Sequence, residues 1–197
     1  TQSVAEEVAL AVAGAFADIR HRMAYRSALD ELDLSVHPSR SIQVASTKRI
    51  RAGMLSGKPL QIVKETDAMI GVGAVVCGES RVSNLERALL DAARRPSLVG
   101  GAAVLAEAIV AAADNVDTAR LMHYAQTLGW ASALRRIGSI ADALDVPRVA
   151  GHLRPLKRLT ADLDLEPGAD GVYAWRDARW RIRWPLSIGE IRAVTQQ

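Results

Sequence analysis

The first eighty residues combine helix-like and strand-like patterns of hydrophobic positions. Apolar residues on most sides of 3–19, and at helical spacing in 21–34, predict two helices. Alternating polar and apolar positions in 41–46 and 60–64 predict two half-buried strands, and 69–77 predicts a third, longer one. This part of the chain is therefore expected to be a mixture of helices and strands.

The best-specified helix is predicted over 83–96, with the sequence SNLERALLDAARRP. Ser83 can cap its N-terminus, and Glu86 stands three residues later, which is the spacing of a capping box. Apolar residues recur at steps of three and four, so one face of the helix is hydrophobic. Pro96 is expected to end the helix because proline lacks the backbone N–H.

Helical patterns dominate the rest of the chain. The glycine pair at 100–101 opens one helix, and Asp117 and Gly129 are a good N-cap and C-terminal glycine for the next. Further helices are predicted over 130–144 and, more weakly, from Pro147 to about residue 159. We therefore expect an α+β fold with a strand-containing part over 1–80 and a mainly helical part over 81–197.

Two late runs, 172–175 and 180–184, flank a short polar connection and predict a β-hairpin. Because the second run is followed by Pro185, we expect it at the edge of its sheet. In a strand over 180–184, the tryptophans and Ile182 would share one face and alternate with arginines on the other. These arginines are Arg179, Arg181 and Arg183.

The three hairpin arginines have two interpretations, which the sequence leaves open. They can be a solvated outer face over a buried tryptophan face. They can also form a row that binds an acidic protein or a nucleic-acid backbone, since aligned like charges repel unless a partner compensates them. A second candidate contact is the basic loop between the first two predicted strands, with Lys48, Arg49 and Arg51.

Composition narrows the class of protein. Hydrophobic residues make up 49% of the 197 residues, which argues against a disordered chain. The net charge of +3 is uneven: residues 1–119 carry −1 and residues 120–197 carry +4. Of the 25 basic residues 21 are arginines, which suits bidentate contacts to carboxylate or phosphate but also fits the codon usage of a GC-rich genome. The total charge alone therefore identifies no partner.

The cysteine content and the hydrophobic runs bear on location. A single cysteine, Cys77, excludes an internal disulfide framework and fits the reducing cytoplasm. The longest Ala- and Val-rich run, 98–113, contains Glu107 and is shorter than a membrane span. No signal peptide is expected, because Glu6 and Glu7 stand where a positive flank belongs. We therefore expect a cytoplasmic protein that does not contact a membrane.

No known catalytic motif can be identified. The glycines and lysine of 53–59 are spaced one residue short of a P-loop and are followed by proline rather than Ser or Thr. The four histidines have no metal-ligand spacing among themselves or with Cys77. We therefore predict no catalytic residue, no metal site and no cofactor.

The chain resembles the C-terminal region of AbiEi-type antitoxins of type IV toxin–antitoxin systems. The most specific part of the resemblance is RVSNLERALLD at 81–91, with Ser83, Glu86, Arg87 and Asp91. The similarity runs from about residue 25 to residue 184. It also includes YRSAL at 25–29, LDL at 32–34, VAS at 44–46, Arg95-Pro96, Gly100-Gly101, the 121–129 helix end, RRIG at 135–138 and the late Trp-Arg-Ile strand.

The resemblance implies an antitoxin that counteracts a nucleotidyltransferase-like toxin, a class that adds nucleotides to a target such as tRNA. Many relatives carry an N-terminal winged helix-turn-helix that represses their operon. Only some 24 residues precede Tyr25 here, too few for such a domain, so it is either lacking or was trimmed. The four motif residues are interpreted as structural, because a cap and a salt bridge explain them.

Three functional hypotheses follow. The first is direct binding of the toxin through the arginines of the hairpin or the basic loop. The second is indirect neutralisation by covalent modification of the toxin, for example phosphorylation by an atypical kinase. The third is DNA binding as an autorepressor, although no recognition helix is visible. We expect a protein that is not an enzyme, with the kinase as the open alternative.

Overall fold

The computed structural model describes residues 4–51, 53–153, 161–166 and 171–195. The chain is an α+β protein, as its pattern predicts, with 47% of its residues in helices and 19% in strands. It forms two compact units, Thr1–Ala88 (unit 1) and Leu89–Gln197 (unit 2). The division falls within helix α4 (Leu85–Arg94), and the predicted boundary after residue 80 falls within strand β6 (Ser80–Ser83).

Unit 1 is built on a six-stranded mixed sheet with the order β3-β4-β2-β1-β6-β5. Strand β2 is parallel to β4, and β1 is parallel to β6, while the other neighbours are antiparallel. In chain order the strands are β1 (His21–Met23), β2 (Ile42–Ser46), β3 (Met54–Leu55), β4 (Lys58–Lys64), β5 (Ala74–Cys77) and β6 (Ser80–Ser83).

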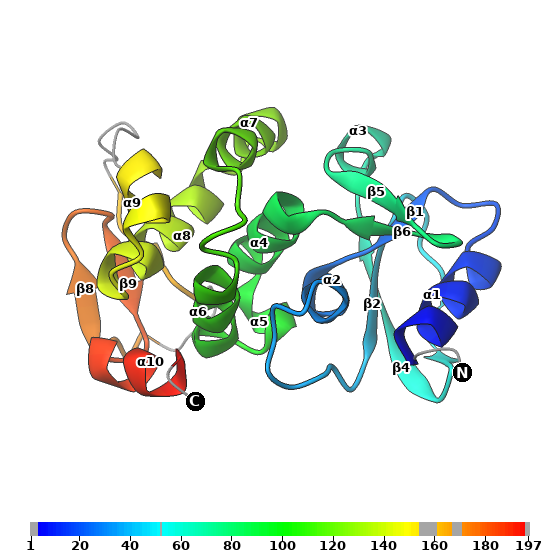
Figure 1. The fold of residues 1–197 in the computed structure, drawn as a ribbon, viewed down its shortest axis with the longest axis horizontal. Helices are drawn as coiled ribbons and strands as arrows, with labels where there is room; N and C mark the ends of the chain where they lie inside the picture. The colour runs from blue at the N-terminus through cyan, green and yellow to red at the C-terminus, as the bar shows by residue number, and fades with distance from the viewer. Residues whose placement is uncertain (1–3, 52, 154–160, 167–170, 196–197) are drawn as a thin grey trace. The chain divides into compact units, whose positions relative to one another are not determined.

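Helices cover both faces of this sheet. In Figure 1, strand β2 runs between helix α1 (Val4–Ala15) and helix α2 (Tyr25–Glu31). The Phe16 ring lies 5.1 Å from the His21 ring, so the chain just after α1 packs against the first strand. A short helix α3 (Asp67–Ile70) follows β4. The sheet is therefore the core of unit 1.

Strand β2 is confirmed, but its predicted half-buried character is wrong. All five of its residues are buried, including Gln43. Strands pair on both of its sides, and Gln43 accepts a hydrogen bond from the Arg26 backbone N–H while its own N–H donates to Ser27. A strand covered on both faces can carry polar residues only where partners satisfy them.

The predicted helix over 21–34 is wrong in its first part. Residues 21–23 form β1 between β2 and β6, and α2 begins only at Tyr25, which has a φ of +52°. Arg22 is completely buried and donates to Glu65. Sheet pairing and this buried ion pair are tertiary interactions, and they override the local helical pattern.

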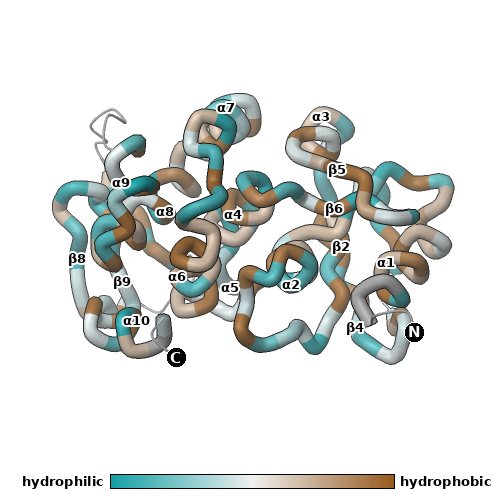
Figure 2. Tube along the Cα trace, viewed as in Figure 1, coloured by the Kyte–Doolittle hydropathy of each residue, from teal (hydrophilic) through white to brown (hydrophobic). Residues whose placement is uncertain are grey.

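The predicted strand over 69–77 is only half correct. Thr66 caps α3 by accepting a hydrogen bond from the Met69 backbone N–H, so residues 67–70 are helical and only β5 is extended. Strand β5 is hydrophobic along its length, as the colours of Figure 2 show, yet Val75 and Val76 are exposed at the edge of the sheet. The apolar run therefore does not mark a buried strand.

Unit 2 is helical around α8, with a small sheet against it. Helix α8 contacts α6, α7, α9 and strand β9. It is buried around most of its circumference, which is typical of a central helix. The helices are α5 (Pro96–Val99), α6 (Ala102–Ala111), α7 (Thr118–Leu128), α8 (Ala131–Ala143), α9 (Pro147–Leu153) and α10 (Ile188–Thr195).

The helix ends in unit 2 follow their sequence signals in most cases. Asp117 caps α7 by accepting from the Arg120 backbone N–H at 3.0 Å, and Gly129 adopts the predicted left-handed conformation with a φ of +69°. Pro96 ends α4 as predicted but also begins α5, since proline is favoured at the first helical position. The part of the predicted helix after residue 153 lies outside the described residues.

The predicted late hairpin is confirmed, but its first strand was predicted over 172–175 and lies at 175–177. The predicted place of its second strand at the sheet edge is wrong. Strands β8 (Trp175–Asp177) and β9 (Ile182–Trp184) pair antiparallel. An unpredicted strand, β7 (Leu163–Asp164), pairs in parallel with the other side of β9, so β9 is central. Pro185 follows the last paired residue, so its missing N–H interrupts no hydrogen bond of the sheet.

Candidate functional site

The most tightly organised polar group in unit 1 is a buried ion cluster at the junction of sheet and helix α4. Both Arg22 and Arg87 donate from Nη2 to the two carboxylate oxygens of Glu65, at 2.9–3.0 Å. The arginine side chains are 0% exposed and that of Glu65 is 3% exposed. We call this group the buried cluster. Two buried guanidinium groups are thus held by one carboxylate.

The Nη1 donors of the two arginines connect further segments. Arg22 donates from Nη1 to the Ser83 hydroxyl at 2.6 Å, and Arg87 donates from Nη1 to the carbonyls of Met69 and Val72. Removing one partner from such a pair costs about 3–5 kcal/mol, because it leaves a buried charge uncompensated. The cluster therefore holds β1, β6, α3 and the start of α4 together.

The motif residues of 81–91 all lie in this region, but their predicted capping box is wrong. Asn84, not Ser83, caps α4 by accepting from the Arg87 backbone N–H at 3.1 Å. Ser83 is the last residue of β6, and its hydroxyl donates to the Met23 carbonyl while accepting from Arg22. Ser83, Glu86, Arg87 and Asp91 are each at most 2% exposed.

In unit 2, the apolar face of the late hairpin closes the core as predicted. Trp180, Ile182 and Trp184 are buried. The indole N–H of Trp184 donates to the Ser139 hydroxyl at 2.9 Å, so its polar atom is satisfied inside the core. The Trp180 ring packs directly on Gly138, where an added Cβ would lie 2.3 Å from it.

The predicted geometry of the hairpin arginines is wrong in part. A continuous strand over 180–184 was expected, but β9 begins at Ile182, and Arg179 and Arg181 belong to the turn before it. Arg181 has a φ of +53°, which breaks the extended conformation. The turn arises because the Asp177 carboxylate accepts the backbone N–H groups of Arg179 and Trp180.

Each hairpin arginine has a carboxylate partner inside unit 2. Arg179 pairs with Asp142 at 3.3 Å, Arg181 with Asp162 at 3.0 Å and Arg183 with Asp164 at 2.7 Å. Their side chains are 36–53% exposed. The charge of this predicted contact surface is therefore compensated within the protein.

Asp162 is the centre of that compensation. It accepts two hydrogen bonds from Arg176 at 2.9 Å and a third from Arg181. The Arg176 hydrogen bond, followed by the charges of both arginines, lowers the pKa of Asp162 to about 2. The carboxylate therefore stays ionised at every physiological pH. Its negative charge offsets the repulsion between the two neighbouring arginines.

The basic loop of unit 1 differs in this respect. Lys48, Arg49 and Arg51 follow the end of β2 and are exposed. None of their side chains makes a hydrogen bond or an ion pair with any residue that the structure describes. The loop thus presents three positive charges that no side chain of the described residues compensates.

Two buried arginines of α8 were missed as functional groups by the sequence reasoning. Arg135 donates to the backbone carbonyls of Trp180 and Arg181, and Arg136 donates to those of Ala93 and Asp164. Burial, followed by the nearby arginine charges, lowers the pKa of Arg136 to about 10. The available signal was a pair of adjacent arginines among the apolar positions of a predicted helix, since a buried arginine needs acceptors for its five N–H donors.

The described residues offer neither a metal site nor a membrane-spanning helix. There, no group of three or more His, Cys, Asp or Glu side chains is placed to hold a metal ion. Nor does the described part of the chain contain a helix that is both long enough and apolar enough to cross a bilayer.

Comparison with known proteins shows a likeness in structure but none in sequence. No family model matches the chain, and no curated protein matches its sequence. Among solved structures, the chain is similar to the crystal structure of the Rv2827c protein from Mycobacterium tuberculosis, with a TM-score of 0.66 and 14% identity. The likeness covers 93% of this chain and 68% of that one. At this identity it shows a shared fold only.

Proposed function

We propose that this protein is an antitoxin of the AbiEi type, which neutralises a cognate nucleotidyltransferase-like toxin by binding it directly. The observation that supports this proposal is the placement of residues 81–91, the most specific part of the resemblance. They form the junction of β6 and α4, and Arg87 belongs to the buried cluster. Two of the four motif residues, Ser83 and Arg87, are thus among the residues that hold unit 1 together.

Of the two predicted contact surfaces, the proposal favours the basic loop. A charged group contributes to association when its charge is free to steer and pair with a partner. The loop residues Lys48, Arg49 and Arg51 have that freedom among the described residues, whereas Arg181 and Arg183 already hold Asp162 and Asp164. A toxin of this class concentrates carboxylates around its metal site, which is a complementary surface for the loop.

The decisive experiment is a calorimetric titration of the protein into its purified neighbouring toxin. Lys48, Arg49 and Arg51 are replaced together by Glu, and the affinity is expected to fall at least about tenfold, mainly through a slower association. The matched control reverses three scattered exposed arginines, Arg40, Arg120 and Arg148, and thus makes the same change in net charge. The control should stay within about threefold of the wild type.

The titration also separates the alternatives. An equal loss in both triple variants would show that only net charge matters, and would remove the loop as a specific contact. No binding by the wild-type protein, with growth rescue preserved in cells, would refute direct binding and favour covalent modification of the toxin. Binding to operator DNA in place of the toxin would favour the autorepressor. The proposal places the encounter in the cytoplasm, where a free thiol such as that of Cys77 remains reduced.

A further inference from the structure

A pocket of about 240 Å³ lies in unit 1 beside α2 and the start of β4. This is several times the volume of about 30 Å³ that one water molecule occupies in the liquid. Segments from α1, β1, α2, the chain before β2, and β4 form its wall. The residues that matter here are Val8, Met23, Glu31, Ile42 and Lys58.

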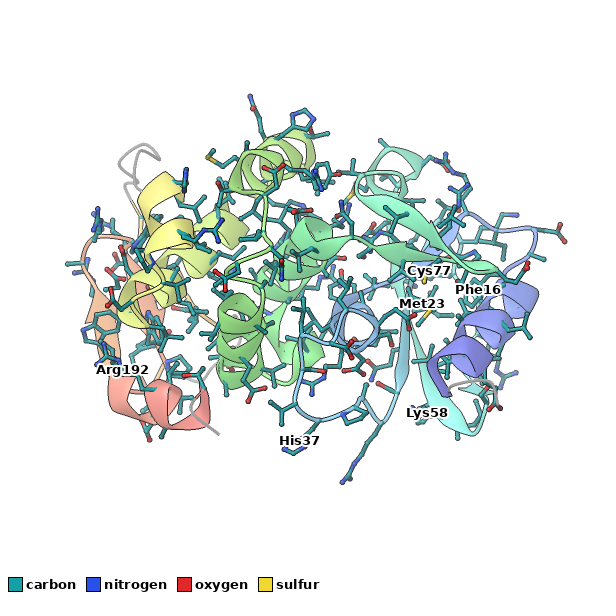
Figure 3. All side chains as sticks on the ribbon, viewed as in Figure 1. Phe16, Met23, His37, Lys58, Cys77 and Arg192 are labelled. Carbon is teal, nitrogen blue, oxygen red and sulfur yellow. The ribbon has the colours of Figure 1, made fainter. Side chains whose placement is uncertain are left out.

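The pocket contains one amino group with unused donors. The Lys58 Nζ makes a single long hydrogen bond, 3.4 Å, to the carbonyl of Ser39. No carboxylate of the described residues lies within ion-pair distance of it. An ammonium group carries three N–H donors, so at least two of those on Lys58 are available to a ligand. Figure 3 labels Lys58, together with Met23, among the side chains of unit 1.

The pocket also contains one carboxylate with unused acceptors. Glu31 is half-buried at the end of α2, and its only partner among the described residues is the Cys77 thiol, a weak donor at 3.7 Å. Asp30, which lines the same pocket, differs because it accepts from the Ser35 hydroxyl and the Ser39 backbone N–H and pairs with Arg26 at 3.3 Å. The pocket therefore exposes one free carboxylate and one free ammonium.

Part of the remaining wall suits an aliphatic group, beside the polar side chains of Ser27, Ser39 and Ser41. Val8, Met23 and Ile42 are at most 9% exposed and provide apolar surface next to the two charges. Lys58 and Glu31 carry opposite charges but do not form an ion pair with each other. Each is therefore available to an opposite charge on a ligand, and partial burial strengthens such an attraction. A ligand that carries both charges and an apolar side chain would satisfy all three features together.

We propose that this pocket binds a small zwitterion with an aliphatic side chain, such as a free α-amino acid. Lys58 pairs with the ligand carboxylate, Glu31 accepts from its ammonium group, and its side chain lies against Met23 and Ile42. Bound ligand joins α2 to the start of β4, so it also stabilises unit 1 by mass action. This site is separate from the proposed toxin contact and does not depend on it.

The test is a calorimetric titration of the whole chain with L-leucine and L-methionine, together with two blocked forms of leucine. N-acetyl-leucine lacks the ammonium group, and leucinamide lacks the carboxylate. We expect the wild-type protein to bind leucine at least about tenfold more tightly than either blocked form. A rise in melting temperature with leucine should accompany the binding.

Two variants test which pocket residue binds which charged group of the ligand. Lys58→Gln should weaken leucine binding about tenfold but leave leucinamide binding unchanged. Glu31→Gln should weaken leucine binding to the same degree but leave N-acetyl-leucine binding unchanged. Lys64→Gln, at the other end of β4, and Glu79→Gln are exposed control variants that should bind as the wild type does.

Three outcomes would overturn the proposal. One is the absence of saturable binding of either amino acid below about 10 mM. Another is equal binding of leucine and both blocked forms, since the pocket would then recognise only the side chain. The third is an equal loss in the pocket variants and their exposed controls. Gln has the shape of Glu and is somewhat shorter than Lys, whose side chain here makes only one long hydrogen bond. Misfolding of the variants is therefore not expected, and their melting temperatures without ligand verify this.

Discussion

The two basic surfaces of this protein look alike as strings of residues and differ in their electrostatics. The hairpin arginines of unit 2 each hold an aspartate, and Asp162 holds two arginines at once. The basic loop of unit 1 has no such partner among the described residues. A run of positive charges thus either forms ion pairs within the protein or stays available to a partner. Only the location of the carboxylates decides which.

In the buried cluster, charges that are fully buried compensate one another. Disrupting this cluster should therefore have the largest effect on the free energy of unfolding. Replacing Glu65 by Gln removes the buried carboxylate to which both Arg22 and Arg87 donate. We expect the free energy of unfolding to fall by about 3–5 kcal/mol, measured by urea denaturation. The exposed Glu79→Gln is the matched control and should stay within about 0.5 kcal/mol of the wild type. A loss below about 1 kcal/mol for Glu65→Gln would contradict the assigned role.

The packing beneath the hairpin arginines can be broken separately from their charges. In Gly138→Ala, the new Cβ would meet the Trp180 ring at 2.3 Å. Overpacking of this kind typically destabilises by about 1–3 kcal/mol. Gly151→Ala in α9 is the control, because nothing lies within 4 Å of its Cβ position and alanine favours a helix. Equal stability of the two variants would show that Trp180 can move aside.

Acid should reveal the compensation of the hairpin arginines. The folded pKa of Asp162 is about 2, below its ordinary value of 3.8. A lowered pKa contributes stability that is fully present above the ordinary value and is lost as the pH falls from about 4 towards 2. Asp162→Asn should therefore flatten the pH dependence of unfolding in that window. Asp33→Asn, which removes an exposed carboxylate elsewhere, should retain the wild-type slope.

The smallest expected effect tests the comparison itself. Changing Lys48, Arg49 and Arg51 to Gln should alter the free energy of unfolding by no more than about 0.5 kcal/mol, because the loop charges stabilise nothing within the described structure. Changing Arg181 and Arg183 to Gln should lower it by up to about 1 kcal/mol for each pair lost. Both are read from urea midpoints at low and at high salt. A larger loss in the loop variant would reverse the comparison.

The sequence predicted those parts of the fold whose signals are local. Helices α6, α7 and α8 follow from hydrophobic spacing, and Asp117 and Gly129 act at the ends where their chemistry places them. The buried tryptophan face of the hairpin follows from alternation. Caps, turns and periodicity involve residues a few positions apart, so one sequence window contains them.

Other features depended on residues far apart in the chain. His21–Met23 is a strand because β2 and β6 lie on either side of it, and Arg22 meets Glu65 across 43 positions. The capping residue of α4 moved from Ser83 to Asn84 because the Ser83 hydroxyl is used by Arg22 and Met23. A buried tertiary interaction overrides a local helix or capping preference when it contributes more free energy to folding.

By itself, the sequence determined the α+β class and most helices of the second half, and it gave candidate residues for binding that stay a prediction. Only the tertiary structure decided which arginines are free. Asp162 and Asp164 lie some 20 positions before the arginines that they neutralise, and β7 brings them beside β9. The same holds for Glu31 and Lys58, which are charges without a pattern until the fold places them in one pocket. Charge compensation acts over a few ångströms in space, and the order of residues along the chain does not record that distance.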